Sequence, residues 1–233
     1  MSIIGALVWP DHGVICSDGR RFGSACVRQN GSVVQPAQIE RDNFDKTFEL
    51  DGERGIGAFC GLLSFGGSAV GDHIREIASA LAPNHPDLAA LVAAVRRGLK
   101  QRLERVDPGE VMFTERKVDV FLVGPTGPTG AEMRIYALRF CPSGNAIAHT
   151  AWTYPLGRKR WEVRFLGDGA AQKAATQAAQ ADLNKPGALR LGQTFVAECL
   201  RRAIEAGGAS CGLHPRGTDP SCGGRTFTRS TSC

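Results

Sequence analysis

The chain lacks the features of a membrane protein or an exported protein. None of its apolar runs approaches the roughly 18 residues that a membrane helix needs. Residues 1–4 contain no basic side chain, so the N-terminus does not resemble a signal peptide. No sequence period repeats along the 233 residues, which argues against a solenoid. These absences predict a soluble, cytoplasmic globular protein with no membrane partner.

The chain also lacks a strong charge of either sign. Its net charge is +5, and no group of Lys and Arg residues dominates. The densest basic stretch, residues 158–160, lies beside Trp161 and could contact a nucleic acid. Short basic stretches of this kind are usually solvated strand edges. We therefore predict no nucleic-acid partner.

Cysteine is present, but not in the pattern of a disulfide-rich or metal-binding domain. The 8 Cys residues are scattered through a chain that is not small, so we expect reduced thiols. Cys211, His214, Cys222 and Cys233 could be written as a zinc site, yet their spacing is irregular. The Gly-rich stretch 124–130 lacks the Lys-Ser/Thr pair of a phosphate-binding loop and is read as a turn. We predict no metal and no cofactor.

Hydrophobic periodicity divides the chain into blocks of strands and pairs of helices. Strands are expected at 3–9, 14–16, 46–50, 55–60, 118–123, 134–140 and 161–166, and after the turn at 142–145. Helices are expected over 70–81, from Asn84 or Asp87 to Leu103, over 170–179 and over 195–204. Residues 19–45 form a long polar loop, of a length that is often functional. This order predicts sheets packed on each other with helices outside.

Ser2 is the first candidate for chemistry. Its small side chain favours enzymatic removal of Met1, which would leave a Ser with a free α-amine. An α-amine has a pKa of about 7.7–8.0, so it is partly neutral near pH 7 and can act as a base. An N-terminal hydroxyl residue can thus hold a nucleophile and its base together. Ser is a common second residue, so this signal needs support from the rest of the chain.

That support comes from the flanking residues. The segments 2–6 and 13–20 are similar to the start of proteasome-type β subunits, which are N-terminal nucleophile hydrolases. In that family the first mature residue is a Thr, and an Asp lies sixteen residues further on. Here Asp18 lies sixteen residues after Ser2, and the Asp18-Gly19 pair resembles the bacterial HslV branch.

The resemblance continues in order along nearly the whole chain. Residues 46–50 resemble the strand that begins with the catalytic Lys, and 57–61 resemble the strand that ends in an oxyanion-hole Gly. Residues 165–170 resemble the start of the third helix, and 219–224 resemble the Asp-x-x-Ser-Gly-Gly segment. The resemblance implies an α+β fold, a four-layer αββα sandwich. It implies that residues 1–233 form a single proteasome-like peptidase domain from which Met1 is removed.

The resemblance also implies roles for individual residues. Ser2 Oγ would attack a peptide carbonyl, and the Ser2 amine would be the general base. Lys46, held by Asp18, would place a positive charge beside Oγ. The Gly61 N–H would stabilise the oxyanion. Asp219 and Cys222 would orient the N-terminal residue. The residues expected at the substrate site are Arg20, Phe59, Cys60, Asp168 and Gly169.

The chain departs from the family pattern at several positions. The nucleophile is Ser rather than Thr, and Asp168 replaces a Ser, so its carboxylate could hold the amine protonated. Lys46 comes about a dozen residues late, which indicates an insertion within 19–45. A longer pore-facing loop occurs in the bacterial proteasome homologue (BPH) branch, which this chain resembles most. Residues 208–212 are a second match to the segment at 219–224 but lack its Asp, and the closing strands are expected to be short or missing.

The predicted function is that of a self-compartmentalising endopeptidase that hydrolyses unfolded polypeptides. The resemblance implies a homo-oligomeric double ring with six or seven subunits per ring. Relatives are fed by a ring-shaped AAA+ ATPase, and nothing in this sequence shows whether this chain has such a partner. Two alternatives stay open: a hydrolase of the same fold that cleaves small amides, and a catalytically inactive ring that acts as a scaffold or binding chamber.

Overall fold

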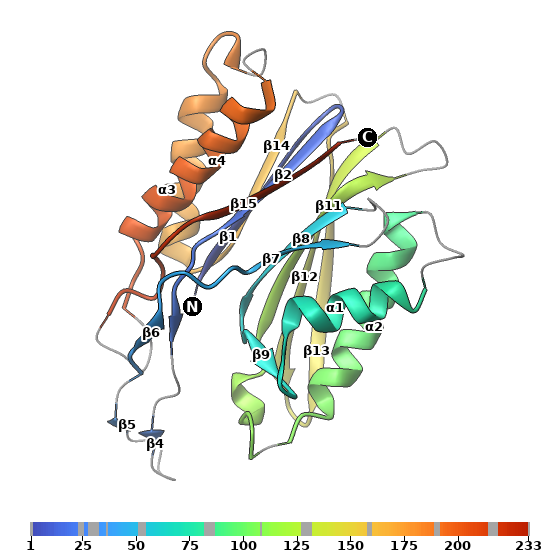
Figure 1. Cartoon of the computed structure of the whole chain (residues 1–233), viewed down its shortest axis with the longest axis vertical. Helices are drawn as coiled ribbons and strands as arrows, with labels where there is room; N and C mark the ends of the chain where they lie inside the picture. The colour runs from blue at the N-terminus through green and yellow to red at the C-terminus, as the bar shows by residue number, and fades with distance from the viewer. Residues whose placement is uncertain are drawn as a thin grey trace.

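The computed structural model shows a mixed α and β chain with several sheets (Figure 1). It describes residues 2–22, 26–27, 33–35, 37–50, 55–81, 87–107, 109–126, 132–157, 160–188, 192–213 and 219–232. Parts of the expected 19–45 loop, residues 51–54 and 127–131, the basic residues 158–159, and His214 and Cys233 lie outside this description. Within the described part, no helix is long and apolar enough to cross a membrane.

Two antiparallel sheets form the centre of the molecule. The first has the order β14-β1-β2-β15, made of Glu162–Gly167, Ile3–Trp9, His12–Ser17 and Phe227–Ser232. The second has the order β13-β12-β11-β8-β7, made of Ala146–Pro155, Glu132–Ser143, Val118–Thr126, Gly55–Gly61 and Thr47–Leu50. The predicted strands are therefore present.

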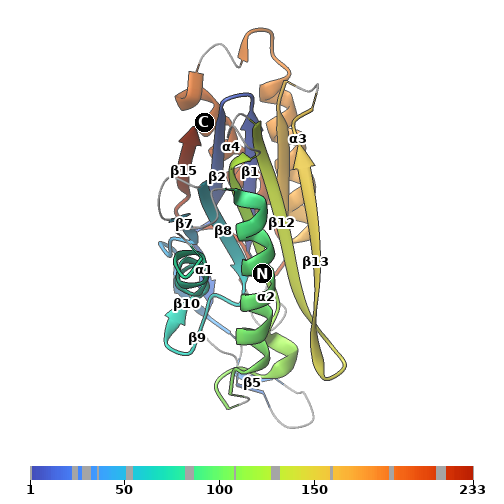
Figure 2. The same cartoon turned by 90° about the vertical axis from the view of Figure 1, so that its right-hand side faces the viewer.

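Helices cover the outer face of each sheet. The helices α1 (Val70–Ser79) and α2 (Leu88–Glu104) pack on the five-stranded sheet, as Figure 2 shows, and α3 (Gly169–Leu183) and α4 (Gly192–Ala209) pack on the other. Asp87 begins α2 by accepting the Ala89 N–H, which resolves the choice between Asn84 and Asp87. On α3, Ala171, Ala175 and Ala179 are buried, which lets α4 approach closely.

Successive side chains of β1 point to opposite faces of the sheet, and this alternation shows why the layers form. Ile3, Leu7 and Trp9 point into a core shared with α3 and α4. Ile4, Ala6 and Val8 point into a second core, which they share with residues of the other sheet. A strand that is buried on both faces reads as one continuous apolar run. A third core lies between α1, α2 and the five-stranded sheet, so the layers follow the order helices, sheet, sheet, helices.

The C-terminal strand decides between two expectations, because the closing strands were expected to be short or missing. A short strand of 6 residues, β15, is present, and it pairs with β2 along its whole length, from Phe227 opposite Ser17 to Ser232 opposite His12. Arg229 ties β15 to β7, because its Nε donates to Thr47 Oγ1 at 2.8 Å and its Nη1 contacts Glu49 at 2.7 Å. The closing strand therefore holds the strand that follows Lys46.

Shorter elements complete the described chain. The pairs β3 (Arg21–Phe22) with β6 (Ile39–Arg41) and β4 (Cys26–Val27) with β5 (Val33–Gln35) lie within the expected insertion. The pair β9 (Ser64–Phe65) and β10 (Ser68–Ala69) precedes α1, and a 3₁₀ turn, η3, spans Phe113–Glu115.

Candidate active site

Ser2, Asp18 and Lys46 meet at the end of the first sheet. The Lys46 Nζ donates to Ser2 Oγ at 2.8 Å and to Asp18 Oδ1 at 2.8 Å. All three residues are buried, with exposed fractions of 5 %, 1 % and 0 % for Ser2, Asp18 and Lys46. Attraction between opposite charges is stronger out of water, so the Asp18 carboxylate holds the ammonium group in place, where it also donates to the hydroxyl. Three residues that the sequence spreads over 44 positions thus form one hydrogen-bonded group.

Backbone groups hold Asp18 in place. The Ile3 N–H donates to Asp18 Oδ1 at 3.1 Å, and the Gly223 N–H donates to Asp18 Oδ2 at 3.0 Å. The Asp18 N–H in turn donates to the Ile3 carbonyl at 3.1 Å. The carboxylate therefore accepts bonds from three separate parts of the chain, and its position is fixed relative to Ser2 because Ile3 is the next residue.

Strand β14 fixes the other side of Ser2. Ile3 pairs with Gly167, and the Asp168 N–H donates to the Ser2 carbonyl at 3.1 Å. Gly167 has a positive φ of +121°, and a Cβ built there would lie 1.8 Å from the Ser2 carbonyl oxygen. This position needs glycine both for its backbone conformation and for the close approach of Ser2.

Asp168 is engaged at the start of α3. Its Oδ1 accepts the N–H groups of Ala170 and Ala171, both at 3.0 Å, so it is the N-cap of the helix. The side chain is buried, and no hydrogen bond joins its carboxylate to Ser2 among the described residues. Gly169 is exposed at the first position of α3. The carboxylate that the sequence places near the amine is thus engaged as a helix cap.

The residues of β8 divide between two environments. Phe59 is buried against Phe48 in the core beneath α1 and α2. Cys60 points the other way, into the core between the sheets, where burial raises the pKa of its thiol. Asp119, Lys46 and Asp18 are close enough to act electrostatically on Cys60. The structure therefore brings Cys60 toward Asp18 and Lys46 and turns Phe59 to the opposite face of β8.

Gly61 ends β8, opposite Val118 of β11. Its φ is +94°, and a Cβ there would lie 2.3 Å from the Lys117 carbonyl oxygen. Gly61 is exposed, unlike the six residues of β8 that precede it. The backbone can therefore approach another group closely at this point, and the oxyanion role of its N–H stays a prediction.

The remaining predicted residues lie in or near residues 219–224, which we call the Gly223 segment. Arg20 pairs with Asp42 at 2.8 Å and donates to the Pro220 carbonyl at 3.1 Å. Its guanidinium therefore joins Asp42 to the segment that contains Pro220. Asp219 is half-buried and makes no hydrogen bond with Ser2 in the described part of the chain. Residues 219–224, rather than 208–212, supply the contact with Asp18.

The prediction of reduced thiols was wrong for Cys222. It forms a disulfide with Cys211, which also removes both residues from the irregular zinc pattern. Cys16, Cys60, Cys141 and Cys199 are free among the described cysteines. The Cys222 side chain is buried in the core beneath α3 and α4. It cannot orient Ser2 as a free thiol while this bond is present.

Sequence reasoning missed the direct role of Gly223. Its N–H donates to Asp18, and its carbonyl accepts the Gly19 N–H at 3.1 Å. Its φ is +137°, and a Cβ would crowd the Arg20 guanidinium. The Gly223-Gly224 pair was a visible signal of special backbone conformation, but its partner lies 205 positions away.

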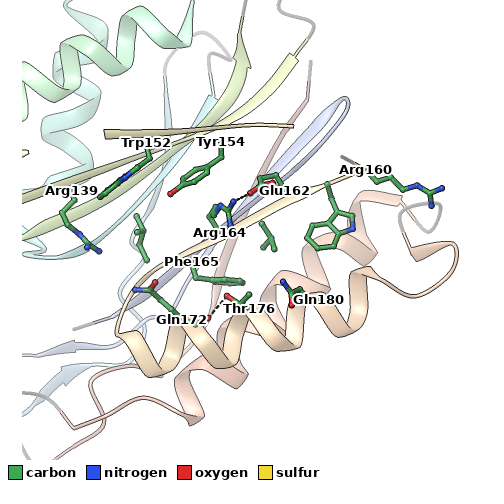
Figure 3. A pocket seen from close by; sticks show the side chains of 13 residues that line it. Arg139, Trp152, Tyr154, Arg160, Glu162, Arg164, Phe165, Gln172, Thr176 and Gln180 are labelled. Atoms are coloured by element: carbon green, nitrogen blue, oxygen red, sulfur yellow. Dashed lines mark hydrogen bonds and ion pairs between the residues drawn. The ribbon is translucent and has the colours of Figure 1, made fainter. Parts of the chain in front are cut away.

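A cavity of about 910 Å³ lies along β14, apart from Ser2. We call it the β14 trough; Figure 3 shows β13 on one side and α3 on the other. Its lining includes Trp152 and Tyr154 of β13, Arg164 of β14, and Gln172 and Thr176 of α3. The lining reaches Leu166, the neighbour of Gly167, but does not include Ser2, Asp18 or Lys46.

No family model matches the chain, and no curated protein sequence matches it.

Proposed function

We propose that this chain is an N-terminal nucleophile endopeptidase in which Ser2 is both nucleophile and general base. The observation that carries the proposal is the buried contact of Lys46 Nζ with both Ser2 Oγ and Asp18 Oδ1, each at 2.8 Å. Burying a Lys and an Asp is costly unless they are paired and hydrogen-bonded. The position of this buried pair against the Ser2 hydroxyl supports a chemical role for the three residues.

The proposed reaction begins when removal of Met1 frees the Ser2 amine. The amine takes the Ser2 Oγ proton, and Oγ attacks the peptide carbonyl. The Lys46 charge stabilises the developing alkoxide, and the Gly61 N–H is the proposed donor to the tetrahedral oxyanion. The amine then passes its proton to the leaving nitrogen. Water hydrolyses the resulting Ser2 ester and regenerates the hydroxyl.

The layer order supports the proposal. An N-terminal nucleophile hydrolase of the proteasome type is an αββα sandwich, and helices on the outer faces of two packed sheets are compatible with that architecture. The start of β1 lies between β2, which leads to Asp18, and β14, which leads to Asp168. Ser2 is therefore flanked on both sides by strand ends, where polar groups can be presented.

A peptide epoxyketone tests the proposed nucleophile directly. This reagent forms its ring adduct only with a residue that offers both a hydroxyl and a free α-amine. We expect the intact mass of the purified protein to show loss of Met1 and a single adduct, and we expect Ser2→Ala to show loss of Met1 without an adduct.

The other outcomes decide against the proposal. Retained Met1 would leave Ser2 without a free amine and would favour a catalytically inactive ring. Loss of Met1 without an adduct would mean that the amine or the pocket is disabled. An adduct together with hydrolysis of small amides, but not of unfolded polypeptides, would favour a small-amide hydrolase.

We further propose that the chain works as a homo-oligomeric double ring, with copies packed against the β14 trough. Strands β13 and β14 are both sheet edges, and β13 is exposed at most of its residues. Arg139 lies over the Trp152 ring at 5.9 Å and Arg164 over the Tyr154 ring at 4.5 Å. Trp, Tyr and Arg are enriched at protein interfaces, and proteins usually protect exposed edge strands.

Light scattering tests the assembly. We expect twelve or fourteen copies per particle for the wild type and smaller species for Trp152→Glu, because a charge on this exposed edge opposes burial. Met112→Glu is the matched control, since Met112 is also an exposed apolar residue but lies outside the trough. A wild type that is monomeric or dimeric would contradict the ring. Equal effects of Trp152→Glu and Met112→Glu on particle size would contradict the placement of the subunit contact at the β14 trough.

A further inference from the structure

We propose that the Cys211–Cys222 disulfide is a positioning element of the Ser2 centre, and that its reduction by a dithiol reversibly lowers the rate of hydrolysis. The inference rests on the proposed function, because it concerns the same site. It begins from the place of the disulfide in the chain. Cys211 follows the end of α4, and Cys222 immediately precedes Gly223. The bond therefore fastens the Gly223 segment to the helical layer.

Gly223 transmits this restraint to the site. Its N–H donates to Asp18 Oδ2 at 3.0 Å, and its carbonyl accepts the Gly19 N–H at 3.1 Å. The two bonds clamp the segment onto residues 18 and 19. The disulfide is therefore one residue away from a hydrogen-bond donor to Asp18, and Asp18 is the carboxylate that holds Lys46.

Other hydrogen bonds among the described residues also hold the segment. The Ser221 N–H donates to the Gly212 carbonyl at 2.9 Å, which joins the two sides that the disulfide connects. Arg20 donates to the Pro220 carbonyl, and the Arg225 N–H donates to the Asp42 carbonyl at 2.6 Å. These bonds keep the segment near the site after reduction. Reduction should therefore displace Gly223 and lower the activity without abolishing the Asp18–Lys46 pair.

The reduction is ordinary thiol–disulfide exchange. Cys211 is half-buried and Cys222 is buried, so a thiolate of the dithiol reaches the Cys211 sulfur first. That sulfur forms a mixed disulfide, and Cys222 leaves with the electron pair and takes up a proton. The second thiolate of the dithiol then displaces Cys211, which is also protonated. The products are two cysteine thiols and the cyclic disulfide of the reductant.

The experiment compares oxidised and dithiol-reduced protein in a peptide-hydrolysis assay. Mapping of alkylated peptides should show the 211–222 link in the oxidised protein only. We expect reduction to lower kcat about tenfold, since small displacements of catalytic groups are costly. KM should change little, because Asp18 does not contact the substrate in the proposed mechanism. Reoxidation should restore the rate. Circular dichroism at the assay temperature checks that both forms remain folded.

Two variants separate reduction of the Cys211–Cys222 disulfide from other effects of the dithiol on the protein. The double variant Cys211→Ser/Cys222→Ser should have the low kcat of the reduced protein and should not respond to the dithiol. Cys141→Ser is the matched control, because Cys141 is a half-buried free cysteine on β12, and it should respond as the wild type does. Equal kcat values for the oxidised and reduced wild type, or a map without the 211–222 link, would overturn the inference.

The failure of this inference is distinguishable from failure of the proposed function. If the oxidised protein forms no epoxyketone adduct, the nucleophile itself is wrong. If the adduct forms and kcat is insensitive to the dithiol, the nucleophile stands and only the positioning role of the disulfide is excluded.

Discussion

Replacing Lys46 by Met should abolish peptide hydrolysis and lower the free energy of unfolding by about 3–5 kcal/mol. The Lys46 side chain is fully buried, and Asp18 is almost so. Without the ammonium group, Asp18 keeps two backbone donors among the described residues, Ile3 and Gly223, but its buried negative charge is no longer paired with a positive charge. Met has a similar volume, so a cavity contributes little to the loss. Urea unfolding and a peptide-hydrolysis assay measure the two effects.

A double variant separates catalysis from stability. Lys46→Met/Asp18→Asn removes both charges, so it should recover part of the lost stability while hydrolysis stays undetectable. Lys100→Met is the control for removal of a paired Lys, because the Lys100–Glu104 pair is partly exposed and should contribute at most about 1 kcal/mol. Wild-type turnover in Lys46→Met would contradict the role of Lys46, and recovery of hydrolysis in the double variant would show that the role is structural.

The sequence predicted the elements that local periodicity specifies. The N-terminal hairpin is present, with Ile3–Trp9 paired to His12–Ser17. The helix pairs follow the strand blocks in the expected order. Ser2, Asp18 and Lys46 were predicted as one group because the segments that carry them resemble segments of a known family, although Lys46 comes about a dozen residues later than in that family. These features need only neighbouring residues, or a resemblance, to be recognised.

Side-chain direction within β8 was harder to predict. Phe59 and Cys60 were both expected at the substrate site, yet successive residues of a strand point to opposite faces. Both faces of β8 are buried, one under α1 and α2 and the other between the sheets. An apolar run with two buried faces carries no polar alternation to show which residue faces which layer.

The disulfide was not predictable from the sequence. Eight Cys residues allow many pairings, and the absence of an export signal favoured free thiols. The disulfide joins Cys211, which follows α4, to Cys222, which lies 11 positions further on, and its formation depends on where the tertiary fold places these two residues. The same is true of Gly223, whose N–H meets a carboxylate that is 205 positions away in the chain.

Gly167 lies directly against the backbone of Ser2. We expect Gly167→Ala to lower kcat at least a hundredfold, because a misplacement of about 1 Å is costly in catalysis. Its Cβ would lie 1.8 Å from the Ser2 carbonyl oxygen, so β14 or Ser2 must move. The positive φ of +121° adds about 1–3 kcal/mol of strain. Hydrolysis rates, the rate of epoxyketone adduct formation and urea unfolding measure these effects.

Gly187→Ala is the matched control for backbone strain alone. Gly187 also has a positive φ, +78°, but no atom lies within 4 Å of the position of its Cβ. We expect it to lose about 1 kcal/mol of stability and to keep the wild-type kcat. A loss of kcat confined to Gly167→Ala would show that displacement of Ser2, rather than general destabilisation, is responsible. Wild-type turnover in Gly167→Ala would contradict the site, because the contact that fixes the Ser2 carbonyl cannot survive the added methyl group unchanged.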